Sequence, residues 1–513
     1  GTHKGAISIA INSSITETAS AVLHQTGYNG TSDYSTVHVY PTVSGLTING
    51  NLAGPLIDLS GANNVTLDGS VEGLGSTKDL IISNLSTSTT LGTSTIRFIN
   101  AASNNTVKNC TIKGSSLSAT TSFSTGGGIL LFSTTATTGN NNNLIDNNNI
   151  TNAGGNRPKT ALYSYGTSGA TNDGNTISNN MFYDFFSPVM SSAGIYLNSY
   201  TSAWNITGNT FYETTALAPT TLSTYYGIRA YSSSASTRGS GFTISDNFIG
   251  GNASDHTGTL TISSAQTHGF FGIDLWVGTT TTSSIQNNTI KNINYTTTAQ
   301  TPFYGINISS GNVNIGTVTG NTIGSTTGNG SISLTSSTNF TISEGIKNGG
   351  SGTVNIQNNK IGGITIIGAA SAGHSFYGID ASGGSSIISN NTIGSADAGT
   401  TNSIWASYST TGTQNIYGIY SNGATPLTIS RNMVSQLTNA ATGSVGEVTG
   451  IKLSSAALTN NITNNIIILG GDTKTTIYGI YETGSSSSNS NLYFNTVYIA
   501  GTLASGTIKS YAL

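Results

Sequence analysis

Two aspartates, Asp274 and Asp380, occupy the same place in a repeated motif, two residues after the glycine of a Gly-Ile pair. Hydrolysis of a glycosidic bond requires two carboxyl groups about 5 to 9.5 Å apart. If each repeat is one coil of a stacked structure, three coils separate the two aspartates. That is about 14 Å at the spacing of neighbouring strands. This pair is therefore predicted to be too far apart for catalysis.

The same position in other copies of the motif carries mixed charges and aromatic rings. On a β-strand these side chains point away from the core, so they could form a strip that contacts a ligand. The alternative, which we favour, is a solvated face without a ligand. The candidate ligand-contact strip consists of Arg229, Asp274, Lys347, Asp380 and Tyr420.

Residues that could hold a metal or a cofactor are scattered along the chain. The acids form no cluster of the kind that binds calcium. His268 and His374 have no second ligand at metal spacing and are predicted to lie in loops. No Gly-x-Ser-x-Gly elbow, phosphate loop or Cys-x-x-Cys pair occurs. We therefore expect no metal, no cofactor, no catalytic residue and no enzymatic activity.

The composition excludes several classes of partner. Only 7% of the 513 residues are charged, the net charge is −3, and there is no basic run. The electrostatic footprint for nucleic acid is thus absent, and no apolar run is long enough to insert into a membrane. Hydrophobic residues still make up 35% of the chain, and 23 tyrosines occur, so an ordered core can form. The single cysteine, Cys110, alternates with hydrophobic positions and is predicted to be a buried structural thiol.

Two short motifs repeat along the chain. The first is a Gly-Ile pair, whose copies are mostly 29 to 45 residues apart. The second is an asparagine with an apolar residue three before it and two after it, 13 to 20 residues beyond the glycine. The asparagines are Asn180, Asn209, Asn247, Asn288, Asn321, Asn359, Asn391, Asn432, Asn465 and Asn495. Most of the variation in length lies in the segment between each of these asparagines and the next Gly-Ile pair.

Such a repeat cannot bury its apolar face alone and must stack on its neighbours. We predict an all-β, single-stranded parallel β-helix of about 13 rungs, with variable loops on one side. The asparagines should form a ladder at a corner, each tolerating a left-handed backbone and bonding the next amide. Residues 1–55 are expected to form an N-terminal cap or first rung, and residues 56–513 the body, continuing beyond the last residue.

Strand alternation predicts which side chains face the core. The isoleucine of each Gly-Ile pair and the residue two beyond it should point inward. The residue before the glycine is often aromatic and is assigned the same parity, which predicts an aromatic column at the edge of the core. Its members are Tyr226, Phe271, Tyr304, Tyr377, Tyr417 and Tyr478.

The Gly-Ile strand, the "NNTI" corner and the stretch "LSGANNVTLDG", Leu59 to Gly69, resemble right-handed parallel β-helix modules of the pectate-lyase-like superfamily. The chain is similar to the Ser-, Thr- and Asn-rich kind found in very large secreted surface proteins and adhesins of Gram-negative bacteria. The resemblance implies export, often by the type IX route, and display on the cell surface. The acidic clusters of the enzymatic relatives are missing here.

The leading hypothesis is a non-catalytic extracellular adhesive rod of a bacterial surface protein. It would bind glycans or solid surfaces through side loops and join further modules of the same chain. The candidate contact loops lie near Tyr183 to Phe186, Tyr225 to Tyr231 and Trp405 to Tyr408. The alternative is a polysaccharide lyase or glycoside hydrolase that uses Asp274, Lys347 and Asp380 in a groove. A phage or filament component is a third possibility.

Overall fold

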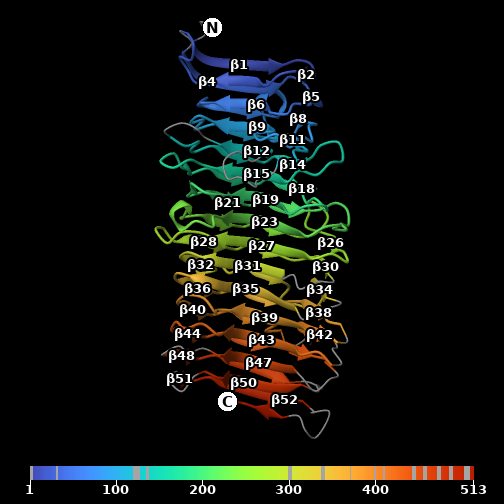
Figure 1. The fold of residues 1–513 in the computed structure, drawn as a ribbon, viewed down its shortest axis with the longest axis vertical. Helices are drawn as coiled ribbons and strands as arrows, with labels where there is room; N and C mark the ends of the chain where they lie inside the picture. The colour runs from blue at the N-terminus through green and yellow to red at the C-terminus, as the bar shows by residue number, and fades with distance from the viewer. Residues whose placement is uncertain are drawn as a thin grey trace. The chain divides into compact units, whose positions relative to one another are not determined.

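The computed structural model is built from parallel β-strands and divides into two compact units (Figure 1). The first unit holds residues 1–214 and 226–247, and the second holds residues 215–225 and 248–513. The structure describes residues 4–30, 33–118, 127–133, 138–297, 303–336, 341–369, 371–397, 400–407, 411–441, 446–454, 459–470, 475–484, 489–501 and 509–513.

Three strands make one coil. The first coil consists of β1 (Lys4–Ile11), β2 (Ile15–Glu17) and β3 (Ala21–His24). Each pairs in parallel with the strand of the same type in the next coil, β4 (Asp33–Pro41), β5 (Leu46–Gly50) and β6 (Pro55–Ser60). Each type occurs fifteen times among the described residues, against the about 13 rungs predicted. The fold is the predicted right-handed parallel β-helix.

The first unit continues this pattern. Its further first-type strands are β7 (Val65–Asp68), β10 (Thr106–Lys108), β13 (Leu144–Asp146), β17 (Thr176–Ser178), β21 (Asn205–Thr207) and β24 (Thr243–Ser245). The second-type strands are β8 (Leu80–Asn84), β11 (Cys110–Gly114), β14 (Asn149–Asn152), β18 (Met181–Tyr183) and β22 (Thr210–Tyr212). The third-type strands are β9 (Ser94–Ile99), β12 (Gly128–Ser133), β15 (Thr160–Tyr165), β19 (Ser192–Leu197) and, from residue 226 onward, β23 (Ser223–Tyr231). Short additions are β16 (Asn172–Asp173), β20 (Thr201–Ser202) and the 3-10 turns η1 (Val71–Gly73) and η2 (Ala235–Thr237).

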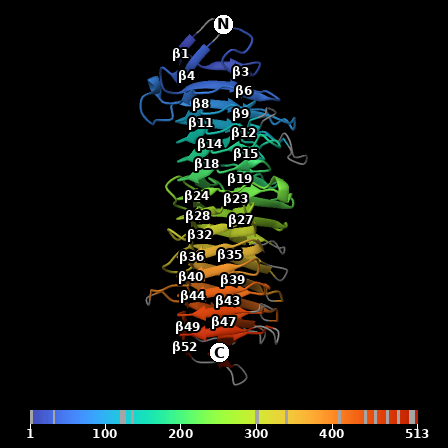
Figure 2. The same cartoon turned by 90° about the vertical axis from the view of Figure 1, so that its left-hand side faces the viewer.

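The second unit repeats the three types. The first-type strands are β28 (Ser283–Gln286), β32 (Val313–Ile315), β36 (Val354–Gln357), β40 (Ser386–Ser389), β44 (Leu427–Ser430), β48 (Asn460–Thr463) and β51 (Ser490–Tyr493). The second-type strands are β25 (Phe248–Ile249), β29 (Thr289–Ile290), β33 (Thr322–Gly324), β37 (Lys360–Gly362), β41 (Thr392–Ile393), β45 (Met433–Ser435), β49 (Ile466–Gly470) and β52 (Thr496–Ala500). The third-type strands are β27 (His268–Trp276), β31 (Phe303–Ser310), β35 (Thr341–Ser351), β39 (His374–Asp380), β43 (Gln414–Ser421), β47 (Gly446–Leu453), β50 (Thr476–Glu482) and β53 (Ser510–Tyr511). Figure 2 shows β32, β36 and β40 following one another beside β35, β39 and β43.

The predicted variable side lies between the second-type and third-type strands. In the second unit this stretch adds a strand to several coils, and these strands form a six-stranded sheet of their own. Its members are β26 (Leu260–Ser263), β30 (Ile293–Thr297), β34 (Ile332–Ser336), β38 (Ile364–Ile367), β42 (Ile404–Ser407) and β46 (Leu437–Asn439). The length variation seen in the sequence therefore includes ordered strands as well as loops.

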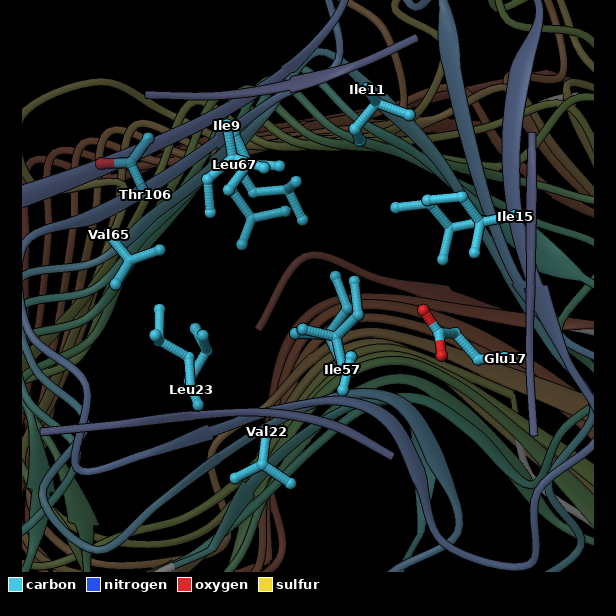
Figure 3. A pocket seen from close by; sticks show the side chains of 16 residues that line it. Ile9, Ile11, Ile15, Glu17, Val22, Leu23, Ile57, Val65, Leu67 and Thr106 are labelled. Carbon is cyan, nitrogen blue, oxygen red and sulfur yellow. The ribbon is translucent and has the colours of Figure 1, made fainter. Parts of the chain in front are cut away.

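Apolar side chains fill the inside of each coil. Ile306 and Ile308, one and three residues after Gly305, are both fully buried, as the alternation predicts. In the first unit, the interior of the first coils contains an apolar pocket of about 320 Å³, into which Ile11 and Leu67 point (Figure 3). Because almost all of its lining is aliphatic, this pocket holds no acid–base set.

The strand bends at the glycine of each Gly-Ile pair. A Cβ atom on Gly305 would lie 2.8 Å from Cδ1 of Ile323 inside the coil, so this position also faces inward. Two successive inward residues break the alternation. The prediction that the residue before the glycine faces the core is therefore wrong. That residue and the one two after the glycine share the outer face, as contacts between Glu344 and Lys347 demonstrate.

The asparagines lie one above another at the corner that precedes each second-type strand. Nδ2 of each donates to Oδ1 of the next asparagine at 2.9 to 3.0 Å, from Asn180 to Asn209 and Asn247 in the first unit, and from Asn288 through Asn321, Asn359, Asn391, Asn432 and Asn465 to Asn495 in the second. The left-handed backbone belongs to the preceding residue, such as Asn287 with φ 53°. The prediction gave one asparagine both the left-handed backbone and the amide hydrogen bond. In the structure the residue before the asparagine has the left-handed backbone, and the asparagine makes the hydrogen bond.

One earlier rung was missed by the sequence analysis. Asn148 joins the same column and donates to Asn180 at 3.0 Å. In the coil before it, Cys110 takes the asparagine's place and donates its backbone N–H to Oδ1 of Asn148 at 2.9 Å. Cys110 is fully buried, in agreement with the predicted structural thiol.

Candidate functional site

The outer face of the third-type strands in the second unit carries two columns of side chains that flank the Gly-Ile pairs. The first outer column holds the residue before each glycine, which is Tyr304, Glu344, Tyr377, Tyr417, Thr449 and Tyr478 on β31, β35, β39, β43, β47 and β50. The second outer column holds the residue two after each glycine, which is Asn307, Lys347, Asp380, Tyr420, Lys452 and Tyr481. Because the strand bends at the glycine, both columns lie on one face.

A cluster of ionisable groups, the Glu344–Lys347–Asp380 centre, joins the two columns. Nζ of Lys347 lies 2.8 Å from Oε1 of Glu344, 3.8 Å from Oδ2 of Asp380 and 3.5 Å from the Tyr304 hydroxyl. The two carboxyl groups also interact with each other, since the charge of Asp380 raises the pKa of Glu344. The hydroxyl of Ser382 donates to Asp380. One ammonium group therefore holds two carboxyl groups on adjacent strands.

Burial raises the pKa values of both carboxyl groups in this centre above those of free side chains. Glu344 is 3% exposed, and burial together with the charge of Asp380 raises its pKa to about 8, against the opposing effect of Lys347. Burial also raises the pKa of Asp380, although the hydrogen bond from Ser382 opposes the shift. Oε2 of Glu344 receives no hydrogen bond from the described residues. The raised pKa favours a proton on Glu344 at neutral pH, while the charge of Lys347 favours the ionised form of Asp380.

Tyrosine rings continue the face beyond this centre. The rings of Tyr377 and Tyr417 stack with centroids 4.7 Å apart, and Tyr420 packs 4.8 Å from Tyr377. Tyr478 and Tyr481 stack at 4.1 Å on a later strand. Tyr377 and Tyr417 are buried. Tyr420, Tyr478 and Tyr481 are partly exposed and offer aromatic surface on which apolar ring faces can stack. The row follows from the parallel register, since equivalent positions of successive coils carry tyrosine.

A second charged group lies within the tyrosine row. The ammonium of Lys452 contacts the carboxylate of Glu447, and it donates to the Tyr417 hydroxyl at 2.9 Å. The Tyr417 hydroxyl also donates to Glu447. Burial and the neighbouring carboxylate of Glu447 raise the pKa of Tyr417 above its usual range. This group contains one carboxylate and no acid partner, so it fixes the tyrosine without offering a second acid–base pair.

The structure brings together three of the five residues of the predicted ligand-contact strip. Lys347, Asp380 and Tyr420 occupy successive strands of the second outer column. Asp274 lies three strands from Asp380, as predicted, and accepts a hydrogen bond from Asn307 at 2.8 Å. Both aspartates are buried, so the solvated-face interpretation does not hold for them. Arg229 belongs to the first unit.

Glu344, the partner that completes the pair, was missed by the sequence analysis. It stands before Gly345, in a position assigned to the core by strict alternation. The signal that could have found it is compositional, since this position is aromatic in most copies and an acid there is exceptional. An unpaired acid at the edge of a core would be costly, which argues for an outward position.

Other sequence predictions about contact residues are corrected. The candidate contact loops are largely strands: Tyr183 ends β18, residues 225–231 lie in β23, and Trp405 lies in β42, while Tyr408 is outside the described residues. His268 and His374 are not loop residues, because they begin β27 and β39 and are buried. The hydroxyl of Ser343 and Nε2 of His374 are 2.8 Å apart, and burial lowers the pKa of His374 to about 4.

Comparisons with known proteins identify no family for the chain. No family model matches the chain, and no curated protein matches it. Among solved structures, the catalytic domain of a GH87 alpha-1,3-glucanase in complex with tetrasaccharides is similar at 13% identity, with a TM-score of 0.29 over 89% of this chain. The chain spans 64% of that domain. A PL6 family alginate lyase is similar at 8% identity, with a TM-score of 0.21, over 96% of this chain and 97% of the lyase.

The prediction that the chain is not an enzyme is wrong. It was argued from the lack of paired carboxyl groups, and the structure pairs Glu344 with Asp380. Among the described residues, no group of three or more His, Cys, Asp or Glu side chains is arranged to hold a metal. Within the same part of the chain, no helix is both long and apolar enough to cross a membrane.

Proposed function

We propose that the protein hydrolyses a polysaccharide that lies along the tyrosine-bearing outer face of the second unit. The observation that carries the proposal is that the carboxyl groups of Glu344 and Asp380, on adjacent strands, both contact Nζ of Lys347. General acid–base catalysis needs one protonated and one ionised group near the same bond. The raised pKa of Glu344 supplies the first at neutral pH, and Asp380 the second.

The charges of this face support a neutral segment of glycan as the substrate. Lys347 is balanced by Asp380 once Glu344 is protonated, and Lys452 is balanced by Glu447. The face therefore offers no excess charge to an acidic sugar. The tyrosine rings instead offer apolar surface to the ring faces of hexoses.

In the proposed reaction, Glu344 donates its proton to the glycosidic oxygen as the bond to the anomeric carbon breaks. A water molecule adds to that carbon and gives a proton to Asp380. Transfer of this proton to Glu344 restores the starting state, so one water is consumed per bond. Lys347, which contacts both carboxyl groups, favours the ionised form of Asp380.

The test is a panel of neutral polysaccharides with reducing ends as the readout. Glu344→Gln and Asp380→Asn are expected to slow cleavage by roughly 10²- to 10⁴-fold, the usual contribution of acid–base groups. Lys360→Gln, at an exposed lysine on β37, is the matched control. Because the pKa of Glu344 is about 8, the rate should fall above that pH. Wild-type rates in both carboxyl variants, or no chain shortening on the panel, would overturn the proposal.

An acidic polysaccharide cleaved to products with an unsaturated end would assign elimination rather than hydrolysis. The same variants decide whether the Glu344–Lys347–Asp380 centre carries it out. We further propose that the protein works outside the cell, where polysaccharides of this length occur, and that the tyrosine row attaches it to glycan-bearing surfaces. Retention of the secreted protein on insoluble glycan, and its loss in Tyr420→Ala, tests this attachment.

A further inference from the structure

A separate pocket lies on the outer face of the third-type strands in the first unit. It has a volume of about 180 Å³ and includes side chains from β15, β19 and β23. It is lined by Lys159, Thr160, Ser191, Ser192, Ala193, Tyr196, Tyr226 and Arg229. Two of these eight residues are cationic and none is acidic. A small pocket with two positive charges and no negative one in its wall favours an anionic group.

Arg229 is held in a fixed position by tyrosine rings. Its guanidinium carbon lies 4.1 Å from the ring centroid of Tyr226, 4.0 Å from that of Tyr231 and 5.1 Å from that of Tyr196. Contact through the ring faces stabilises the cation, and a guanidinium carries five N–H donors in its own plane. Such a planar fork matches the two oxygens of a carboxylate.

Lys159 adds the second charge. Its side chain is half-buried, and burial lowers its pKa below the usual lysine value. A partly desolvated ammonium gains more from an anionic partner than an ammonium in bulk water does. The half-exposed rings of Tyr196 and Tyr226 complete the wall beside both cations. Charge and ring surface thus occur together in one small cavity.

We propose that this pocket binds the carboxylate of an acidic sugar, with Arg229 and Lys159 on the carboxylate and a tyrosine ring against the sugar ring. The shared chemistry of a small oxyanion also admits free phosphate or sulfate. The ring surface favours the saccharide, because an inorganic ion makes no use of it. The inference concerns binding only, in the first unit, and does not depend on the proposed hydrolysis in the second.

Calorimetric titration of the whole protein with D-glucuronate, D-glucose and inorganic phosphate tests the proposal. Glucuronate should bind, and glucose should bind at least about tenfold more weakly, because a charged hydrogen bond contributes about 1.5 to 3 kcal/mol. Arg229→Gln and Lys159→Gln should each weaken glucuronate binding by about the same factor. Arg431→Gln, at an exposed arginine in the second unit, should leave it unchanged.

Arg229→Gln also removes contacts with three tyrosines, so its folding must be checked by circular dichroism. Lys159→Gln lacks those contacts and decides the question if the arginine variant unfolds. Equal binding of glucose and glucuronate, or wild-type affinity in Lys159→Gln, would overturn the proposal. Phosphate that binds as tightly as glucuronate would overturn the saccharide assignment and leave an oxyanion site.

Discussion

Nδ2 of Asn288 donates a hydrogen bond to Oδ1 of Asn321, one coil further along the chain, across 2.9 Å. The same oxygen accepts the backbone N–H of Asn288 at 2.9 Å. Nδ2 of Asn321 in turn donates to the carbonyl of Ile285 and to Asn359. Both asparagines are 1% exposed. We propose that each asparagine therefore depends on the next one in the ladder, because the next one accepts its hydrogen bonds.

Asn321→Ala should destabilise the second unit by roughly 1 to 3 kcal/mol, because it leaves buried donors of Asn288 without an acceptor. Hydrogen exchange measured by mass spectrometry should show faster exchange at the Asn288 amide. Asn355→Ala is the control, since Asn355 is only partly buried and bonds Asn314 outside the core. Equal effects of the two variants would show that the ladder has no special role.

The glycine of the Gly-Ile pair should be equally intolerant, for a different reason. A Cβ on Gly305 would lie 2.6 Å from the carbonyl oxygen of Gly345 and 2.8 Å from Cδ1 of Ile323. Overpacking of this kind costs about 1 to 3 kcal/mol, so Gly305→Ala should lower the urea midpoint. Gly54→Ala is the control, because its Cβ would meet only Ser20 Oγ at 3.9 Å. An unchanged midpoint in Gly305→Ala would mean that the strand relaxes at the bend.

The same bend explains what the sequence could and could not predict. The period of the Gly-Ile and asparagine motifs is a long-range signal, and it was enough to predict the parallel β-helix and the register between coils. It placed Lys347, Asp380 and Tyr420 in one column because all three stand two residues after a glycine. These inferences need only the repeat.

The acid–base pair needed local geometry that the repeat does not contain. Strict alternation puts residues three apart on opposite faces of a strand, so Glu344 and Lys347 were assigned to opposite sides. Because the glycine between them also faces inward, the alternation shifts by one residue and both side chains lie on the outer face. Nζ of Lys347 therefore lies 2.8 Å from Oε1 of Glu344. Likewise, Glu447 contacts Lys452, five residues away, on the same bent type of strand. These charged pairs depend on the backbone conformation at the bend, which the repeat pattern alone does not reveal.

Stability should depend on pH because two buried carboxyl groups hold their protons. Burial is the main cause that raises the pKa of Glu213 in the first unit and of Glu344 in the second to about 8. Their folded-state pKa values lie above the unfolded value of about 4.3, so their contribution is full below that pH and declines as pH rises to about 8. Each group should give a slope of up to roughly 1.4 kcal/mol per pH unit.

Urea unfolding at intervals between pH 5 and 8 measures this slope. Glu344→Gln cannot lose a proton, so it should flatten the curve of the second unit and leave that of the first unchanged. Glu213→Gln should do the reverse, although it also alters the contact with Arg157. A midpoint that is constant across the range in the wild type would contradict the assignment of protonated Glu213 and Glu344.

Cys110 should report on the opening of the first unit. It is fully buried in the column of asparagines, and burial, together with the charge of Asp68, raises its pKa above the usual thiol value. Only an exposed thiolate reacts with an aromatic disulfide reagent. Labelling of the native protein should therefore be at least about a thousandfold slower than labelling in concentrated guanidinium, since it waits for local unfolding. Cys110→Ser, which leaves no other cysteine, gives the background rate. Labelling in native buffer as fast as in denaturant would mean that the coil holding Cys110 opens freely and that the Cys110–Asn148 contact adds no stability.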